Sequence, residues 1–242
     1  MYAVLDIGNT FGKMALYEQG KQLFFERGKV KSLIKSLKKV KTKAILVCSV
    51  AQSKDELTAT FKEFRNLIIL DNNTSLPIIN GYGTPETLGY DRLAGAVAAH
   101  YLFPGEHCLL IDMGTAIKYD YIDSEAVFRG GIISPGLQMR FKALHTFTKK
   151  LPLLEADNIP ELIGNSTDSC IKSGVVNGII AELNGIIERY QKKLDLKILI
   201  SGGDAGFFES QINYPTFAAP NLVLDGLYRI LIHNVENKSF TY

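Results

Sequence analysis

Residues 2–10 read YAVLDIGNT, and residues 108–116 read CLLIDMGTA. Each is an apolar run, typical of a buried strand, that ends in Asp-x-Gly. In both places two further strand-like segments follow, with a turn at Gln19–Gly20 in the first copy and at Asp123–Ser124 in the second. The repeat predicts two similar units, each of which begins with an antiparallel meander.

Helical and strand patterns alternate after each meander, which is typical of sheets flanked by helices. In the first half we expect a helix at 30–40, a strand at 44–50, a helix at 56–64, a strand at 67–70 and a helix at 85–103. In the second half we expect helices at 136–147, 167–194 and 222–235, and a strand at 197–201. The predicted fold class is therefore α/β, with two duplicated domains at 1–104 and 105–242, each a mixed β-sheet flanked by helices.

Composition excludes some classes of function. The chain of 242 residues has 27 Lys and Arg against 25 Asp and Glu, and this balance gives no general attraction to nucleic acid or an anionic membrane. The N-terminus lacks the pattern of a secretory leader, and no apolar run approaches the roughly 20 residues that span a bilayer. We therefore expect a cytoplasmic protein that binds neither nucleic acid nor membrane.

Two local biases in composition also have structural interpretations. Residues 29–43 contain seven lysines, mostly opposite an apolar stripe, which indicates a solvated helix face and leaves a nucleic-acid patch as the alternative. The three cysteines lack metal-site spacing and indicate neither a disulfide framework nor a zinc site. Cys48 and Cys108 lie in apolar runs and are expected in the core.

The turn at residues 6–10 is a candidate phosphate site. Glycine permits close approach, so backbone N–H groups and the Thr10 hydroxyl can point at a phosphate. Asp6 would face the Mg²⁺ that accompanies ATP, and Lys13 would meet phosphate oxygens. The stretch is not a Walker A motif, because it has one residue too few between its glycines. A lone Asp-x-Gly turn is usually a plain hairpin, but its recurrence at Asp112 favours a two-sided clamp on a polyphosphate.

The acceptor of a phosphoryl group needs a carboxylate beside its hydroxyl, and residues 82–92 supply one. Pro85 suits the start of a helix that carries Asp91 and Arg92 into an apolar segment. This Asp-Arg pair is also compatible with a structural ion pair or a helix cap. A third glycine turn, Ser201–Asp204, is compatible with a ribose or phosphate site or with a simple tight turn.

Together these motifs resemble the type III pantothenate kinases, members of the acetate and sugar kinase, heat-shock ATPase and actin superfamily. The matching pieces run in order along nearly the whole chain: Asp6-x-Gly8-Asn9-Thr10-x-x-Lys13, Tyr82 with Gly89-x-Asp91-Arg92, Asp112-x-Gly114-Thr115-Ala116, Gly130-Gly131-x-Ile133-x-Pro135-Gly136, Thr167 with Gly174, and Ser201-Gly202-Gly203-Asp204. The resemblance implies a duplicated ribonuclease H-like fold, a homodimer and a requirement for a monovalent cation. It also implies ATP-dependent phosphorylation of pantothenate to 4′-phosphopantothenate, the first step of coenzyme A biosynthesis.

The resemblance also implies roles for particular residues. ATP would be bound by Asp6, Ile7, Gly8, Asn9, Thr10, Phe11, Gly12 and Lys13, with Thr115 contacting the nucleotide from the opposite half. Asp112 would be a ligand of K⁺, or of NH₄⁺ in its place. Pantothenate would be held by Tyr82, Gly89, Tyr90, Asp91 and Arg92, with Asp91 as the catalytic base and Thr167 reaching the acceptor bound mainly by the neighbouring subunit. The sequence departs from the family pattern at Lys118, where Thr or Val is more frequent.

Other functions remain open at this stage. A kinase for another small alcohol would use the same machinery, and a non-catalytic regulator would keep the fold without turnover. An actin-like or chaperone ATPase is disfavoured because the chain lacks a substrate-binding domain. Three glycines in the expected long helix, Gly174, Gly178 and Gly185, indicate close helix packing, either within the chain or against a second copy.

Overall fold

The computed structural model describes residues 1–8, 10–49 and 51–238, so the predicted phosphate-turn residue Asn9 and the end of the expected strand at Val50 lie outside the described residues. The chain divides into two compact units. Unit 1 comprises residues 1–105, 125–129 and 221–242, and unit 2 comprises residues 106–124 and 130–220. These units differ from the predicted ribonuclease H-like domains at 1–104 and 105–242, which stay a prediction.

Unit 1 contains a mixed five-stranded sheet in the order β3-β2-β1-β4-β5. β1 pairs with β2 antiparallel and with β4 parallel, so the meander and the crossover strands share one sheet. Its elements are β1 (Tyr2–Ile7), β2 (Gly12–Glu18), β3 (Lys21–Gly28), α1 (Val30–Leu37), β4 (Ile45–Ser49), α2 (Lys54–Phe61), β5 (Leu67–Ile69), β6 (Ile79–Asn80), η1 (Pro85–Thr87), α3 (Tyr90–Leu102) and α7 (Leu222–Lys238).

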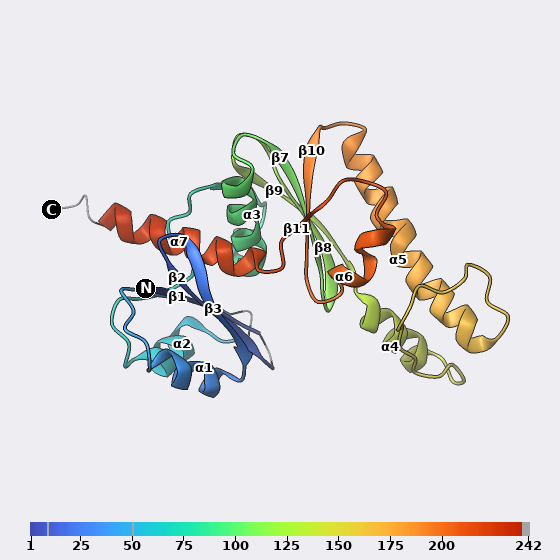
Figure 1. Ribbon diagram of the computed structural model, residues 1–242, viewed down its shortest axis with the longest axis horizontal. Coiled ribbons are helices and arrows are strands. Elements are labelled where there is room, and N and C mark those ends of the chain that lie inside the picture. Colours follow the sequence, from blue (N-terminus) through green and yellow to red (C-terminus); the bar gives the residue numbers. More distant parts are fainter. Residues whose placement is uncertain (9, 50, 239–242) are drawn as a thin grey trace. The chain divides into compact units, whose positions relative to one another are not determined.

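Helices α1 and α2 cover one face of this sheet (Figure 1). Leu33 and Leu37 of α1 and Phe61 of α2 are buried there with the apolar residues of β1, β2 and β4. All seven lysines of residues 29–43 are exposed. This confirms the solvated helix face predicted from the lysine pattern, because the buried residues follow the apolar stripe and the lysines do not.

The helix expected at 85–103 proves to be two elements. Pro85 begins the short 3₁₀ helix η1, and Leu88 then adopts an extended conformation with φ −75° and ψ 127°. The α-helix α3 starts only at Tyr90, with Gly89 as its N-cap residue. The prediction of one continuous helix is therefore wrong at its beginning, and the break places the acceptor motif on the first turn of α3.

Unit 2 repeats the strand arrangement of unit 1. The second sheet has the order β11-β10-β7-β8-β9-β6, and its β9-β8-β7-β10-β11 part corresponds to β3-β2-β1-β4-β5. β7 pairs with β8 antiparallel and with β10 parallel, as β1 does with β2 and β4. The new elements are β7 (His107–Met113), β8 (Ala116–Ile122), β9 (Val127–Pro135), α4 (Leu137–Phe147), α5 (Thr167–Gln191), β10 (Leu196–Ser201), α6 (Ala205–Phe208), η2 (Glu209–Gln211) and β11 (Phe217–Ala218). These two mixed, helix-flanked sheets confirm the predicted duplicated α/β class.

Helix α5 is the long element beside the second sheet (Figure 1). Its residues Val176, Ile179 and Leu183 are fully buried in the core of unit 2. By length and hydropathy alone α5 could also cross a membrane, a property that it shares with core helices of folded proteins.

Candidate active site

The first part of the site is a row of three side chains across the sheet of unit 1. Asp6, near the end of β1, lies opposite Lys13 of β2 and opposite Cys48 of β4. The Cys48 thiol donates a hydrogen bond of 3.5 Å to Asp6 Oδ1. Burial raises the pKa of Cys48 well above its usual value, and the negative charges of Asp6 and Asp91 raise it further. Cys48 is therefore a neutral donor to Asp6, and the charge of Asp91, the predicted base, also favours the neutral thiol.

The phosphate turn closes tightly after Asp6. The Gly8 amide donates to the Phe11 carbonyl at 3.1 Å, and a Cβ on Gly12 would lie 2.9 Å from the Leu33 side chain. Ile7 is buried, whereas Thr10 is exposed and Phe11 is 46% exposed. Among the residues that the structure describes, Lys13 has no ion pair, so its charge is available to an incoming anion.

The acceptor motif occupies the start of α3. A Cβ on Gly89 would lie 2.5 Å from Asp91 Oδ1, so the carboxylate folds back over the N-cap residue and would have to move if Gly89 carried a side chain. The Arg92 side chain is 8% exposed, and its guanidinium carbon lies 5.4 Å from the Tyr82 ring and 5.8 Å from the Phe128 ring. The structure thus brings Tyr82, Arg92 and Asp91 together within unit 1.

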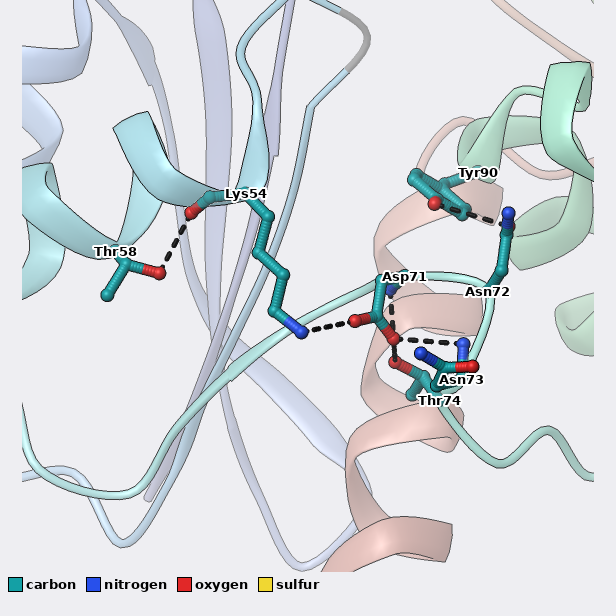
Figure 2. Close-up of polar contacts among 7 residues, drawn as sticks. All are labelled: Lys54, Thr58, Asp71, Asn72, Asn73, Thr74 and Tyr90. Atoms are coloured by element: carbon teal, nitrogen blue, oxygen red, sulfur yellow. Dashed lines mark hydrogen bonds and ion pairs between the residues drawn. The ribbon is translucent and has the colours of Figure 1, made fainter.

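Tyr90 is tied to a polar loop that the sequence did not predict, residues 71–74. Figure 2 shows its hydroxyl turned toward Asn72, with 3.3 Å between the Tyr90 oxygen and Asn72 Oδ1. Lys54 of α2 lies 2.5 Å from the Asp71 carboxylate, and its hydrogen bond holds the pKa of Asp71 below the ordinary value. Thr74 donates to the same carboxylate at 2.9 Å. The loop borders a groove of about 740 Å³ within unit 1.

Unit 2 has an equivalent row of side chains. Asp112, near the end of β7, lies opposite Lys118 of β8 and opposite Ser201 of β10. Lys118 Nζ is 2.6 Å from Asp112 Oδ2, and Ser201 Oγ donates to Asp112 Oδ1 at 3.3 Å. The side chains of Lys118 and Asp112 are 20% and 29% exposed. Both oxygens of the predicted cation ligand therefore already have a partner from the chain.

The turn that carries Thr115 rests on glycines from two other motifs. A Cβ on Gly136 would lie 2.1 Å from the Gly114 carbonyl oxygen, and the Gly136 amide donates to the Thr115 carbonyl at 3.1 Å. Gly202, at φ +97°, brings its backbone so close that a Cβ would lie 2.2 Å from the Met113 carbonyl oxygen. Gly136 and Gly202 thus both lie against the backbone of residues 113–115, where a side chain would clash.

Thr167 is the first residue of α5 and is exposed. Ser166 caps the helix by accepting from the Ser169 amide. A Cβ on Gly174 or on Gly185 would meet no described atom within 4 Å, so close packing within the chain does not explain these glycines. Large apolar side chains near this end of the unit are also exposed, among them Phe147 at 86%, Leu162 at 76% and Ile163 at 86%.

Some residues of the site were not assigned to it from the sequence. Cys48 was expected only as a core residue, although the end of a parallel neighbour of β1 is a position where ligand-binding groups gather. Phe128 and Asn72 carry no local signal, because their roles depend on contacts with Arg92 and Tyr90 that are distant in the chain. Lys118 was noted only as a departure from the family pattern, and its contact with Asp112 depends on strand register.

Comparisons with a family model and with individual sequences point to the same family. A family model described as type III pantothenate kinase matches residues 3–189. A type III pantothenate kinase from Cytophaga hutchinsonii is 40% identical over 97% of this chain and 100% of its own length. One from Christiangramia forsetii is 41% identical over 97% of this chain and 99% of its own.

Comparison with solved structures supports the fold. A protein from Campylobacter jejuni, assigned to a Baf family of transcriptional activators, has a TM-score of 0.64 at 20% identity. The match covers 97% of this chain and 99% of that one. A ROK hexokinase from Thermus thermophilus has a TM-score of 0.55 at 12% identity, with 98% of this chain and 99% of that one covered. At these identities the likeness concerns the fold alone.

Proposed function

Because the chain belongs to the type III pantothenate kinase family, we propose that it transfers the γ-phosphoryl group of MgATP to the primary hydroxyl of pantothenate. It is then a phosphotransferase with an alcohol acceptor, and its product, 4′-phosphopantothenate, is that of the first step of coenzyme A biosynthesis. One observation supports this most strongly. The family model of type III pantothenate kinases matches residues 3–189, a range that contains both the phosphate turn and the acceptor carboxylate Asp91.

The phosphate end of the reaction belongs to the turn after β1. The backbone of Gly8 to Gly12 and the Thr10 hydroxyl bind phosphate oxygens, and Lys13 neutralises their charge. Asp6 faces the Mg²⁺ of the nucleotide with a carboxylate, the hard oxygen ligand that this ion prefers. Phosphoryl transfer passes through a loose transition state, so this positioning and charge neutralisation supply most of the rate enhancement.

The acceptor end belongs to the start of α3. Asp91 orients the attacking hydroxyl and takes its proton late in the transfer. The surface that holds pantothenate is formed by Gly89 and by the cation–π pair of Arg92 and Tyr82. Tyr90 contributes to this surface from its position against the 71–74 loop.

Unit 2 contributes Thr115 and Asp112. The Thr115 hydroxyl contacts the nucleotide, and the glycines beneath its turn fix its backbone. Asp112 holds a positive charge beside the nucleotide, as expected for a ligand of K⁺ or NH₄⁺.

We propose further that the enzyme is a cytoplasmic homodimer that acts without nucleic acid or membrane. The open glycines of α5 and the exposed apolar side chains near Thr167 are suited to contact with a second copy. In this arrangement Thr167 serves the acceptor site of the partner subunit.

The function is tested by measuring ADP formation by the purified full chain with and without pantothenate, and by identifying the phosphorylated product by mass spectrometry. We expect ADP formation that depends on pantothenate and is equal in amount to 4′-phosphopantothenate. Other small alcohols serve as controls. Faster turnover of another alcohol would change the substrate assignment, and no turnover with any acceptor would favour a non-catalytic regulator.

Sharing of sites is tested by mixing an Asp91→Asn chain with a Thr167→Ala chain. If Thr167 serves the partner's site, a mixed dimer has one site with both lesions and one with neither, so activity returns toward half of the parental value. No recovery, with the heterodimer demonstrated by differently tagged chains, rules the shared site out.

A further inference from the structure

We propose that the ε-ammonium of Lys118 takes the place of the monovalent cation expected at Asp112, so that this kinase needs neither K⁺ nor NH₄⁺. The inference rests on the proposed function, because the expected cation is that of a pantothenate kinase. The observation that supports the proposal is the ion pair of 2.6 Å between Lys118 Nζ and Asp112 Oδ2.

The residues around Asp112 do not fit an additional cation. Lys118 pairs with Oδ2 and Ser201 donates to Oδ1, so both oxygens of the carboxylate already bind a donor. A K⁺ ion on Oδ2 would lie beside an ammonium group of the same charge, and like charges at such a separation repel each other strongly away from bulk water.

The chemistry of lysine is suited to the replacement. The expected site accepts NH₄⁺ as well as K⁺, and the end of a lysine side chain is an ammonium ion carried on a flexible alkyl stem. The charge beside Asp112 is thus the same as with a bound ion, but it is covalently part of the chain. No binding equilibrium with salt is needed to fill the position.

The backbone explains why Lys118 reaches Asp112. The two residues are directly opposite each other on the antiparallel strands β7 and β8, where side chains of a cross-strand pair lie on the same face. Their low exposure, 20% for Lys118 and 29% for Asp112, limits screening by salt. The pair is therefore built into the sheet and is not an exposed surface ion pair.

The first test compares the unmodified full chain in K⁺, Na⁺ and tetramethylammonium chloride at equal ionic strength, with ADP measured directly by chromatography so that no coupling enzyme responds to the salt. Tetramethylammonium is too large and lacks N–H donors, so it cannot replace the cation. We expect pantothenate-dependent turnover to change by less than about twofold among the salts. A fall of about tenfold or more in tetramethylammonium would overturn the proposal.

The second test removes the ammonium group. Lys118→Met keeps the length of the side chain without its charge, and we expect turnover in tetramethylammonium to fall on the order of tenfold and to recover when K⁺ or NH₄⁺ is added. Lys118→Arg keeps the charge and should stay independent of K⁺. Lys197→Met is the matched control, since Lys197 lies on the same sheet and its 3.9 Å contact with Glu106 is remote from the Asp112 carboxylate.

Calorimetric titration of ATP into the same proteins tests the role of Lys118 separately from the pantothenate kinase assignment. We expect the affinity of the unmodified chain to be equal in K⁺ and tetramethylammonium, and that of Lys118→Met to be weaker without K⁺. Turnover that is absent in every salt, with equal ATP affinities, would count against the pantothenate kinase assignment but support the role of Lys118. ATP affinity of the unmodified chain that requires K⁺, or a Lys118→Met chain indifferent to K⁺, would refute the role of Lys118 whatever the acceptor.

Discussion

The two sheets present the same row of positions with different electrostatics. In unit 1 the row is Cys48, Asp6 and Lys13, and in unit 2 it is Ser201, Asp112 and Lys118. In each row a thiol or hydroxyl donates to Oδ1 of the central carboxylate, at 3.5 Å from Cys48 and 3.3 Å from Ser201. Among the residues that the structure describes, the lysine forms an ion pair with that carboxylate in unit 2 but not in unit 1.

This difference shows how a duplicated framework can separate two tasks. A lysine that is paired with a carboxylate contributes little net charge to a third group, whereas an unpaired lysine attracts an anion at full strength. Lys13 is therefore suited to the phosphates, and Lys118 is suited to neutralising Asp112. The comparison can be tested by substituting residues of each row and measuring whether the losses of turnover differ in size and in dependence on K⁺.

The largest effect is expected for Lys13→Met, which removes the unpaired charge. We expect turnover to fall by about 10²- to 10³-fold, because a preorganised group that stabilises transition-state charge is lost. Unlike the loss in Lys118→Met, this loss should not be restored by K⁺. The measurement is ADP formation at saturating pantothenate over a range of ATP concentrations. Equal losses in the two variants, with equal response to K⁺, would show that the lysines are interchangeable.

The next effect concerns Asp91, the proposed acceptor carboxylate of unit 1. Asp91→Asn keeps the shape of the side chain and removes the base, so we expect turnover to fall about 10²-fold. ATP affinity, measured by calorimetry, should stay within a factor of about two because Asp91 contacts the acceptor rather than the nucleotide. Near-normal turnover would remove Asp91 from the role of base.

A smaller effect is expected for Asp112→Asn, because this variant loses the ion pair that holds the Lys118 ammonium in place. We expect turnover to fall about tenfold, equivalent to roughly 1.4 kcal/mol of transition-state stabilisation. K⁺ should not restore it, because the variant lacks the carboxylate that would bind the ion. If K⁺ stimulates Asp112→Asn as much as Lys118→Met, the carboxylate is not the ligand.

Much of the fold followed from patterns within short segments. The Asp-x-Gly repeat predicted both meanders, and apolar periodicity predicted α1, α2 and α5 because each buries one face. The start of α3 was missed, since Pro85 is compatible with a 3₁₀ turn as well as with an α-helix. Local sequence does not distinguish these, because the choice depends on how Gly89 and Asp91 pack together.

The site was less predictable than the fold. Residues inside a motif, such as Asp91 and Arg92, could be proposed from the sequence because their spacing is specific. Asn72 was not, because its partner Tyr90 is 18 residues away and the contact exists only in the folded chain. Lys118 was visible as an unusual residue, but its effect on Asp112 required the register between β7 and β8. Which residues pair across neighbouring strands cannot be read directly from a single sequence.

The smallest effects are expected when the donors of the two rows are exchanged. Cys48→Ser gives unit 1 the donor of unit 2, and Ser201→Cys gives unit 2 the donor of unit 1. Each variant still donates to its carboxylate, so we expect turnover within about threefold of the parent. The free energy of unfolding should fall by about 1 kcal/mol in Cys48→Ser, because a more polar group is placed in a fully buried position. Loss of turnover comparable to that of Lys13→Met would show that the thiol has a chemical role.

The reactivity of the unmodified Cys48 tests whether its thiol is neutral in the folded protein. Burial, Asp6 and Asp91 all raise its pKa, so the neutral thiol is favoured and the reactive thiolate is scarce as the pH rises through the usual range of a cysteine. We therefore expect Cys48 to resist iodoacetamide in the folded protein at pH 8 while the exposed Cys170 is alkylated, with both followed by peptide mass spectrometry. Asp6→Asn removes one cause of the raised pKa but not burial, which is the largest, so it should increase the reactivity of Cys48 only slightly. Alkylation of Cys48 as fast as that of Cys170 would mean that the row in unit 1 is open to solvent and that its thiol is not the neutral donor to Asp6.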